Sequence, residues 1–161
     1  MNLILKICKN LMDYINIPKW KLVTRWEKKS QFKDLVDEFQ KSDPFDAASA
    51  MLETLSCVKA PNQLGNIIYG PNYIAIINNE YGINVEYFPK SKRFIIIEKD
   101  SSYEIYKNTE PQKAVEEKWK IAKNIMIADY IEAIVNIIEI MHTGDGEKCK
   151  TILTNLLNLL S

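Results

Sequence analysis

The feature that most constrains the fold is a two-residue period of apolar side chains between Ile67 and Tyr106. In the segment Ile83–Tyr87, apolar and polar residues alternate, which is typical of a strand with one face in the core. We also predict strands over Tyr73–Ile77, Phe94–Ile97 and Tyr103–Tyr106. Phe94–Ile97 is a continuous apolar run, which indicates a central strand covered on both faces.

Short turn signals separate these strands. They lie at Asn78–Gly82, Pro89–Lys92 and Asp100–Ser102. Because such short connections join antiparallel neighbours, the sequence predicts an antiparallel meander of about four strands. Ile67–Tyr69 is a candidate for an additional short edge strand before Gly70.

Helical periodicity flanks the strand region on both sides. Before it, we expect helices over residues 1–17, over 19–41 and from Pro44 to just before Pro61, with Asp43 as the cap of the third. After it, we expect a long helix from Pro111 to Met141 and a last helix from Cys149 to Leu160. With 161 residues and no long linker, the chain is predicted to be a single globular α+β domain over residues 1–161.

The apolar stretch from Ile125 to Met141 raises the question of a membrane span. It contains Asp129, Glu132 and Glu139, and a carboxylate in hydrocarbon costs about 3 kcal/mol or more. With Asn136, these residues form one narrow polar stripe on a helix, so we interpret the stretch as a core helix and expect no membrane partner. The N-terminal segment lacks the basic region and the small-residue cleavage site of a signal peptide. We therefore expect a cytoplasmic protein.

The charge balance argues against direct binding of nucleic acid. Lys and Arg together number 21, and Asp and Glu also number 21, so the formal net charge is +0. A general nucleic-acid binder usually carries a basic excess.

The residues that usually carry catalysis or bind metal are few and scattered. Cys8, Cys57 and Cys149 are widely spaced, and His142 is the single histidine. Glu139 and His142 have the spacing of a helical metal motif, but a second such motif is missing. We therefore predict reduced, buried thiols, no metal, no cofactor and no enzymatic activity.

Two acidic strips and one strand are the candidate surfaces for a partner. The first strip is the stripe of Asp129, Glu132 and Glu139, and the second is formed by Asp34, Asp37 and Glu38. The tyrosine-rich strand region adds Glu86 and Tyr87, because tyrosine beside acidic groups is a common interface composition. A solvated helix face and ordinary strand propensity are the alternative interpretations of these patterns.

In layout and composition the chain resembles the small immunity proteins that bacteria make against polymorphic toxins, including those of contact-dependent growth inhibition. The shared features are a cysteine-poor α+β layout rich in Ile, Lys and Asn, acidic strips and no catalytic motif. The resemblance implies a tight complex with one cognate toxin domain, often a nuclease, whose active site or substrate surface is covered. The acidic strips would then meet the basic groove of the nuclease.

Three other functions stay open from the sequence. The chain is also compatible with an accessory protein of a phage or mobile element that binds a host protein. A self-associating structural domain would use the helical face around Trp20 and Trp26. An unrecognised small enzyme is the last alternative. The sequence does not determine the oligomeric state.

Overall fold

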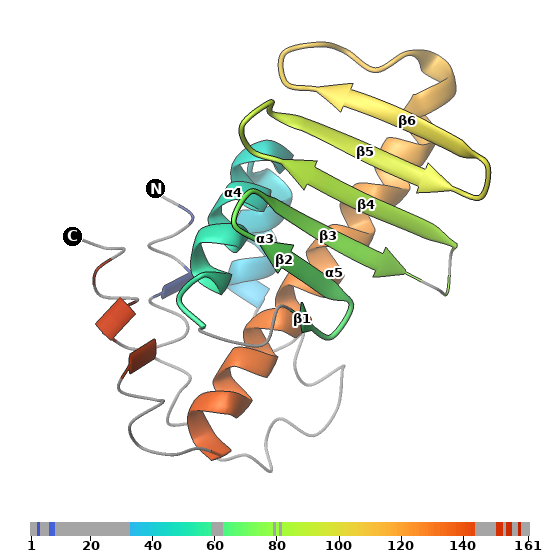
Figure 1. The fold of residues 1–161 in the computed structure, drawn as a ribbon. Helices are drawn as coiled ribbons and strands as arrows, with labels where there is room; N and C mark the ends of the chain where they lie inside the picture. Colours follow the sequence, from blue (N-terminus) through green and yellow to red (C-terminus); the bar gives the residue numbers. More distant parts are fainter. Residues whose placement is uncertain are drawn as a thin grey trace.

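The computed structural model of the protein describes residues 3, 7, 8, 33–58, 63–78, 80, 82–143, 151, 152, 154, 155 and 158. Its elements, in chain order, are α3 (Lys33–Lys41), α4 (Pro44–Leu55), β1 (Gln63–Leu64), β2 (Ile67–Gly70), β3 (Tyr73–Asn78), β4 (Ile83–Phe88), β5 (Arg93–Glu98), β6 (Ser101–Tyr106) and α5 (Lys113–Thr143). Figure 1 shows the strands side by side, with the helices packed against them.

The strands form one antiparallel sheet in the order β1-β2-β3-β4-β5-β6. Each strand pairs with the next one along the chain, as expected for a meander. The predicted α+β class is confirmed, and the four predicted strands correspond to β3, β4, β5 and β6.

The predicted number of strands was too low, because the sheet has six. The candidate edge strand over Ile67–Tyr69 is present as β2, and β1 adds two further residues beyond it. A two-residue strand is too short to show any alternation, so the sequence pattern could not indicate β1. The turn between β1 and β2 passes through Gly65 at φ +58°, a left-handed conformation that favours glycine.

One face of the sheet carries the core. Along β4, Ile83, Val85 and Tyr87 are buried, and the residues between them are only partly buried. The strand pairing places Phe94 opposite Tyr87, and Ile96 opposite Val85, on the same face. The period of two in the sequence therefore separates a core face from an outer face, as predicted.

Helix α5 covers this core face. It contacts β2, β3, β4 and β5, and Figure 1 shows it crossing behind the strands. Its bounds, Lys113–Thr143, agree closely with the predicted helix from Pro111 to Met141. Within the part of the chain that the structure describes, no helix has the length and hydrophobicity needed to cross a membrane.

Helices α3 and α4 pack on the same side of the sheet. Asp43 caps α4 as predicted, since its carboxylate accepts a hydrogen bond of 2.8 Å from the backbone N–H of Phe45. Pro44 occupies the first turn. Helix α3 packs on α5 through Phe39 and Tyr130, whose ring centroids are 5.5 Å apart.

Parts of the other predicted helices fall outside the described residues. Leu3, Ile7 and Cys8 are helical and buried in the core, and Ile152 is helical and buried near the other end of the chain. Residues 151, 154, 155 and 158 are also described and helical, whereas the other residues of the helices predicted over 1–17 and 149–160, and most of the helix predicted over 19–41, lie outside the description.

Four aromatic rings join α4, the sheet and α5. Phe94 of β5 lies 4.6 Å from Tyr87 of β4, and 5.0 Å from both Phe45 of α4 and Trp119 of α5, measured between ring centroids. Tilted and edge-on ring pairs at these distances add stabilisation beyond the burial of apolar area. We call Phe45, Tyr87, Phe94 and Trp119 the aromatic core.

We expect Phe94→Ala to lower the free energy of unfolding by about 3–5 kcal/mol, because it leaves a cavity at the centre of the aromatic core. The measurement is urea unfolding followed by circular dichroism. Tyr106→Ala is the matched control, because Tyr106 is 43% exposed, and its cost should be about 0.5 kcal/mol. Equal losses in the two variants would contradict the central role of Phe94.

Candidate functional site

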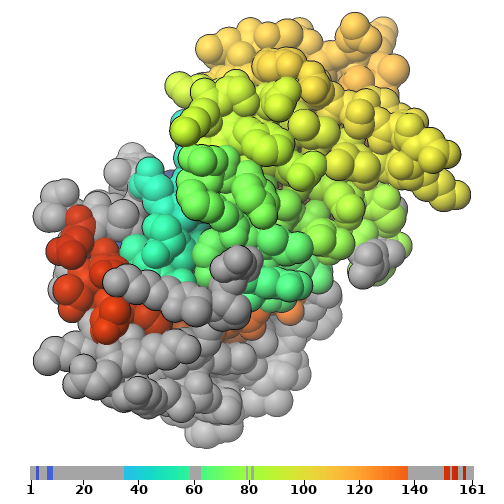
Figure 2. Space-filling view, in the orientation of Figure 1, coloured from blue at the N-terminus to red at the C-terminus, as the bar shows by residue number. Residues whose placement is uncertain are grey.

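The face of the sheet opposite the helices is the candidate site. Residues that alternate with the core positions lie there, and none of the described helices packs on them. Figure 2 looks onto this face, where the strands form a broad surface. We call it the open sheet face. Its side chains include those of Tyr73, Ala75, Asn84, Glu86, Phe88, Arg93, Ile95, Ile97, Ser102, Glu104 and Tyr106.

An aromatic row crosses this face at one end of the strands. Phe88 pairs with Arg93, and Arg93 pairs with Tyr106, so three strands place these side chains next to one another. Tyr73 extends the row onto β3, with its ring centroid 6.4 Å from that of Phe88. Tyr73, Phe88, Arg93 and Tyr106 are the aromatic–arginine row.

Gly70 makes room for the Tyr73 ring. The two residues pair across β2 and β3, and a Cβ atom on Gly70 would lie 2.7 Å from Cε1 of Tyr73. A side chain at position 70 would therefore displace the ring. The glycine that ends β2 is thus one condition for the position of the Tyr73 ring in this row.

Arg93 is held in place by its neighbours in the face. Its guanidinium lies 5.3 Å from the centroid of the Phe88 ring and 3.4 Å from the Glu104 carboxylate. The Tyr106 hydroxyl donates a hydrogen bond of 2.7 Å to the same carboxylate. In contrast, Arg93 Nε is shielded from solvent and has no hydrogen-bond acceptor within the described residues.

A second row carries the acidic groups. In register, Ala75 pairs with Glu86, Glu86 with Ile95, and Ile95 with Glu104. Glu86 is half-buried between Ala75 and Ile95, while Glu104 is exposed. The open sheet face thus combines aromatic rings, aliphatic side chains, one arginine and two carboxylates. This composition can bind a protein surface.

Of the two strand residues predicted to contact a partner, Glu86 lies on the open sheet face and Tyr87 does not. Tyr87 is 2% exposed, and its hydroxyl shares a hydrogen bond of 3.0 Å with Ser49 of α4. Burial raises the pKa of its phenol. In this fold Tyr87 is therefore a core residue, because adjacent residues of a strand point to opposite faces.

The first acidic strip, on α5, is less exposed to solvent than we expected. Asp129 is only 4% exposed, and it accepts a hydrogen bond of 3.2 Å from the side chain of Asn66 in the turn between β1 and β2. Asn136, about two helical turns further along α5, lies next to Gly65 of the same turn. Because this turn covers the stripe, Asp129 is part of the interior. Glu132 is half-buried, and the side chain of Glu139 lies outside the described part of the chain.

The second acidic strip lies on α3. Asp37 and Glu38 are half-buried there, and the side chain of Asp34 is not described. Helix α3 belongs to the helical layer, so this strip and the open sheet face are on different sides of the molecule (Figure 1). The partner-binding role of Asp34, Asp37 and Glu38 stays a prediction.

None of the four residues of the aromatic–arginine row was among the partner-binding residues predicted from the sequence. The signal was present, because Phe88 follows Asn84 and Glu86 with the same two-residue period. The pattern could not tell which of the two faces the helices would cover.

The described residues include no group of three or more His, Cys, Asp or Glu side chains placed to hold a metal ion. Burial raises the pKa of the Cys8 thiol to about 11, with a smaller contribution from Cys57. Burial likewise raises the pKa of Cys57 to about 11, and Glu53 adds to the effect. Neither thiol forms the reactive thiolate at neutral pH.

Comparison of the chain with protein-family models, with curated proteins and with solved structures finds no match.

We expect Asp129→Ala to lower the free energy of unfolding by about 1–3 kcal/mol, because the Asn66 amide would lose a buried acceptor. Urea unfolding at neutral pH measures this loss. Glu86→Ala is the control, since its carboxylate is partly solvated and its removal should have a smaller effect. An Asp129→Ala variant as stable as the parent would indicate that the turn does not depend on this contact.

The buried thiols predict a pH dependence of stability. Below the pKa of an unfolded cysteine, about 8.5, Cys8 and Cys57 are protonated in both the folded and the unfolded state, and their contribution to the free energy of unfolding is fully present. As the pH rises toward 11, the unfolded thiols ionise first, so stability falls. In a Cys149→Ser background, urea unfolding between pH 8 and 11 should show this decline.

The control replaces both thiols with alanine in the same background, and its decline over this pH range should be shallower. In the Cys149→Ser protein, a thiol reagent at pH 8 should react slowly until urea is added. Rapid labelling of the folded protein would contradict the buried positions of Cys8 and Cys57.

Proposed function

We propose that this chain is an immunity protein that binds one cognate toxin domain through the open sheet face and neutralises it. The observation that carries this proposal is the aromatic–arginine row beside Glu86 and Glu104, on a face that no described helix covers. The resemblance in layout to immunity proteins supplies the class of partner.

The side chains of the open sheet face suit a protein partner. Tyrosine and arginine are among the residues that most often dominate binding energy in protein interfaces. Here Tyr73, Phe88 and Tyr106 provide rigid contact area that costs little side-chain entropy. The strand register already holds these side chains in one row before a partner binds. Less side-chain entropy is therefore lost when the complex forms.

The charges of the face favour a partner with basic groups. Glu86 lies near the centre of the sheet, and Glu104 lies on its last strand. A nuclease needs basic side chains to bind phosphates, and carboxylates placed against them would both attract the toxin and cover its substrate surface. Since such a toxin acts on nucleic acid inside the cell, the proposal places the protein in the cytoplasm.

The first test is protection of living cells. The toxin domain encoded by the neighbouring upstream reading frame is expressed in bacteria with and without this chain, and viable cells are counted. We expect the chain to restore viability and to form a complex that co-purifies. Toxicity that the chain does not relieve would refute the immunity function.

The second test places the interface. The double variant E86K/E104K changes the charge of the open sheet face, and we expect it to weaken toxin binding by about 100-fold, because two like charges then face basic groups. Isothermal titration calorimetry measures the affinity, and circular dichroism checks the fold of each variant.

The matched control is D37K/E38K, which makes the same change of charge on α3. We expect it to bind nearly as well as the parent. If D37K/E38K abolishes binding and E86K/E104K does not, the partner docks on the helical layer, as the acidic strip on α3 predicted. That outcome would overturn the open sheet face as the interface but leave the immunity function in place.

A further inference from the structure

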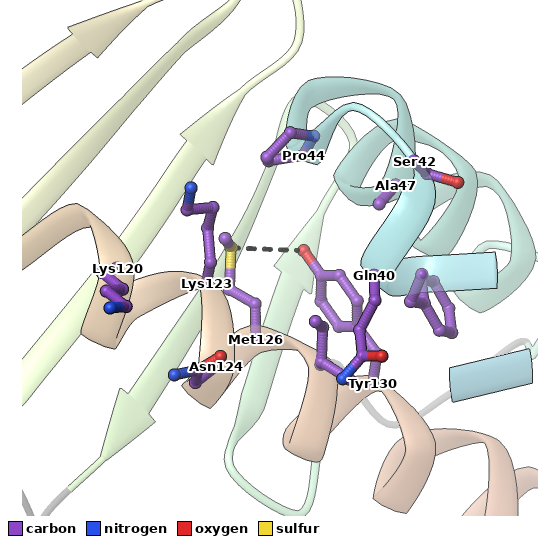
Figure 3. Close-up of a pocket in the computed structure, with 11 residues that line it drawn as sticks. Gln40, Ser42, Pro44, Ala47, Lys120, Lys123, Asn124, Met126 and Tyr130 are labelled. Carbon is purple, nitrogen blue, oxygen red and sulfur yellow. Dashed lines mark hydrogen bonds between the residues drawn. The ribbon is translucent and has the colours of Figure 1, made fainter. Parts of the chain in front are cut away.

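A cavity of about 220 Å³ lies in the helical layer, away from the open sheet face. It lies between the corner that joins α3 to α4 and the side of α5 that faces these helices (Figure 3). Its volume equals that of about seven water molecules at 30 Å³ each. The cavity is therefore smaller than a drug-sized pocket but large enough for a small organic molecule.

The inner wall of the cavity is apolar. Phe39 of α3 and Met126 and Tyr130 of α5 are buried there, with Ala47 of α4 beside them. These side chains belong to three different helices, so the wall is fixed by the packing of the helical layer. Because the wall is already ordered, binding an apolar group against it would cost only the freedom of the ligand itself.

The Tyr130 hydroxyl is a donor with a weak partner. The residue is 2% exposed, and its hydroxyl donates to the thioether sulfur of Met126 at 3.8 Å, as the dashed line in Figure 3 marks. A thioether is a poor acceptor, so most of the hydrogen-bonding capacity of this hydroxyl is unused. Burial raises the pKa of the phenol, which keeps the group protonated and able to donate.

The mouth of the cavity is cationic. Lys120 and Lys123 line it together with the amides of Gln40 and Asn124, and the described lining includes no carboxylate. Neither lysine forms an ion pair within the described ranges of the chain. The ammonium of Lys123 instead lies 5.4 Å from the centroid of the Trp119 ring.

We propose that this cavity binds a small amphipathic carboxylate. The Tyr130 hydroxyl donates a hydrogen bond to the carboxylate, Lys120 and Lys123 of the lining supply the opposite charge, and the apolar body packs on Phe39 and Met126. The site is independent of the proposed toxin-binding function, since it lies on the other side of the sheet and uses none of the same residues.

The probes are phenylacetate and hexanoate, with the neutral phenylacetamide for comparison. We expect saturable binding of at least one acid by isothermal titration calorimetry, and affinity for the amide about tenfold weaker than for phenylacetate, since it lacks the charge that the lysines meet. Amide shifts in NMR spectra should map to Ala47, Met126 and their neighbours. Absence of saturable binding for both acids, or equal binding of phenylacetate and phenylacetamide, overturns the proposal.

Two variants test the residues. K120Q/K123Q should lower the affinity for the bound acid by about tenfold. Tyr130→Phe, which keeps the ring but removes the hydroxyl, should lower it by about threefold to tenfold. The matched control K90Q/K113Q removes two exposed lysines that do not line the cavity and should leave affinity unchanged. An equal effect of the two lysine pairs would show only a general dependence on net charge and would also overturn the proposal.

Discussion

The aromatic core is the contact on which the rest of the structure depends. Phe94 lies between Tyr87, Phe45 and Trp119, so a single side chain links the sheet to α4 and to α5. Both helices are therefore fixed on the same face of the sheet. Because a strand presents alternate residues to opposite faces, the face that the helices cover also determines which residues form the open sheet face.

The two candidate sites follow from that division. Side chains on the helical face, such as Tyr87, are used for packing, whereas Phe88 and Glu86 on either side of it point outward. In the helical layer, packing of α3 on α5 through Phe39 and Tyr130 leaves a cavity beside the contact. The proposed protein-binding surface and the cavity proposed to bind a small molecule are thus separated by the sheet itself.

Local patterns predicted the elements well, and tertiary contacts decided what the sequence could not show. The alternation in Ile83–Tyr87, the cap at Asp43 and the long helix ending near Met141 depend on neighbours within a few residues. Asp129 is different. Its helical spacing indicated a polar stripe correctly, but the turn that covers it comes from Asn66, far away in the chain. Likewise, the period of two could not tell whether Tyr87 or Phe88 would face the helices.

The charged groups of the open sheet face restrict what can cover it. Arg93 Nε is already shielded from solvent and lacks an acceptor in the described part of the chain, so its cost of about 1–3 kcal/mol is present before any partner binds. Glu104 already accepts from the Tyr106 hydroxyl and pairs with Arg93, but an apolar surface placed over the face would remove water from both Glu86 and Glu104. A favourable partner must therefore present basic groups above the acidic row, at the spacing set by the strands. This requirement excludes most hydrophobic surfaces, and it favours one cognate partner over nonspecific association.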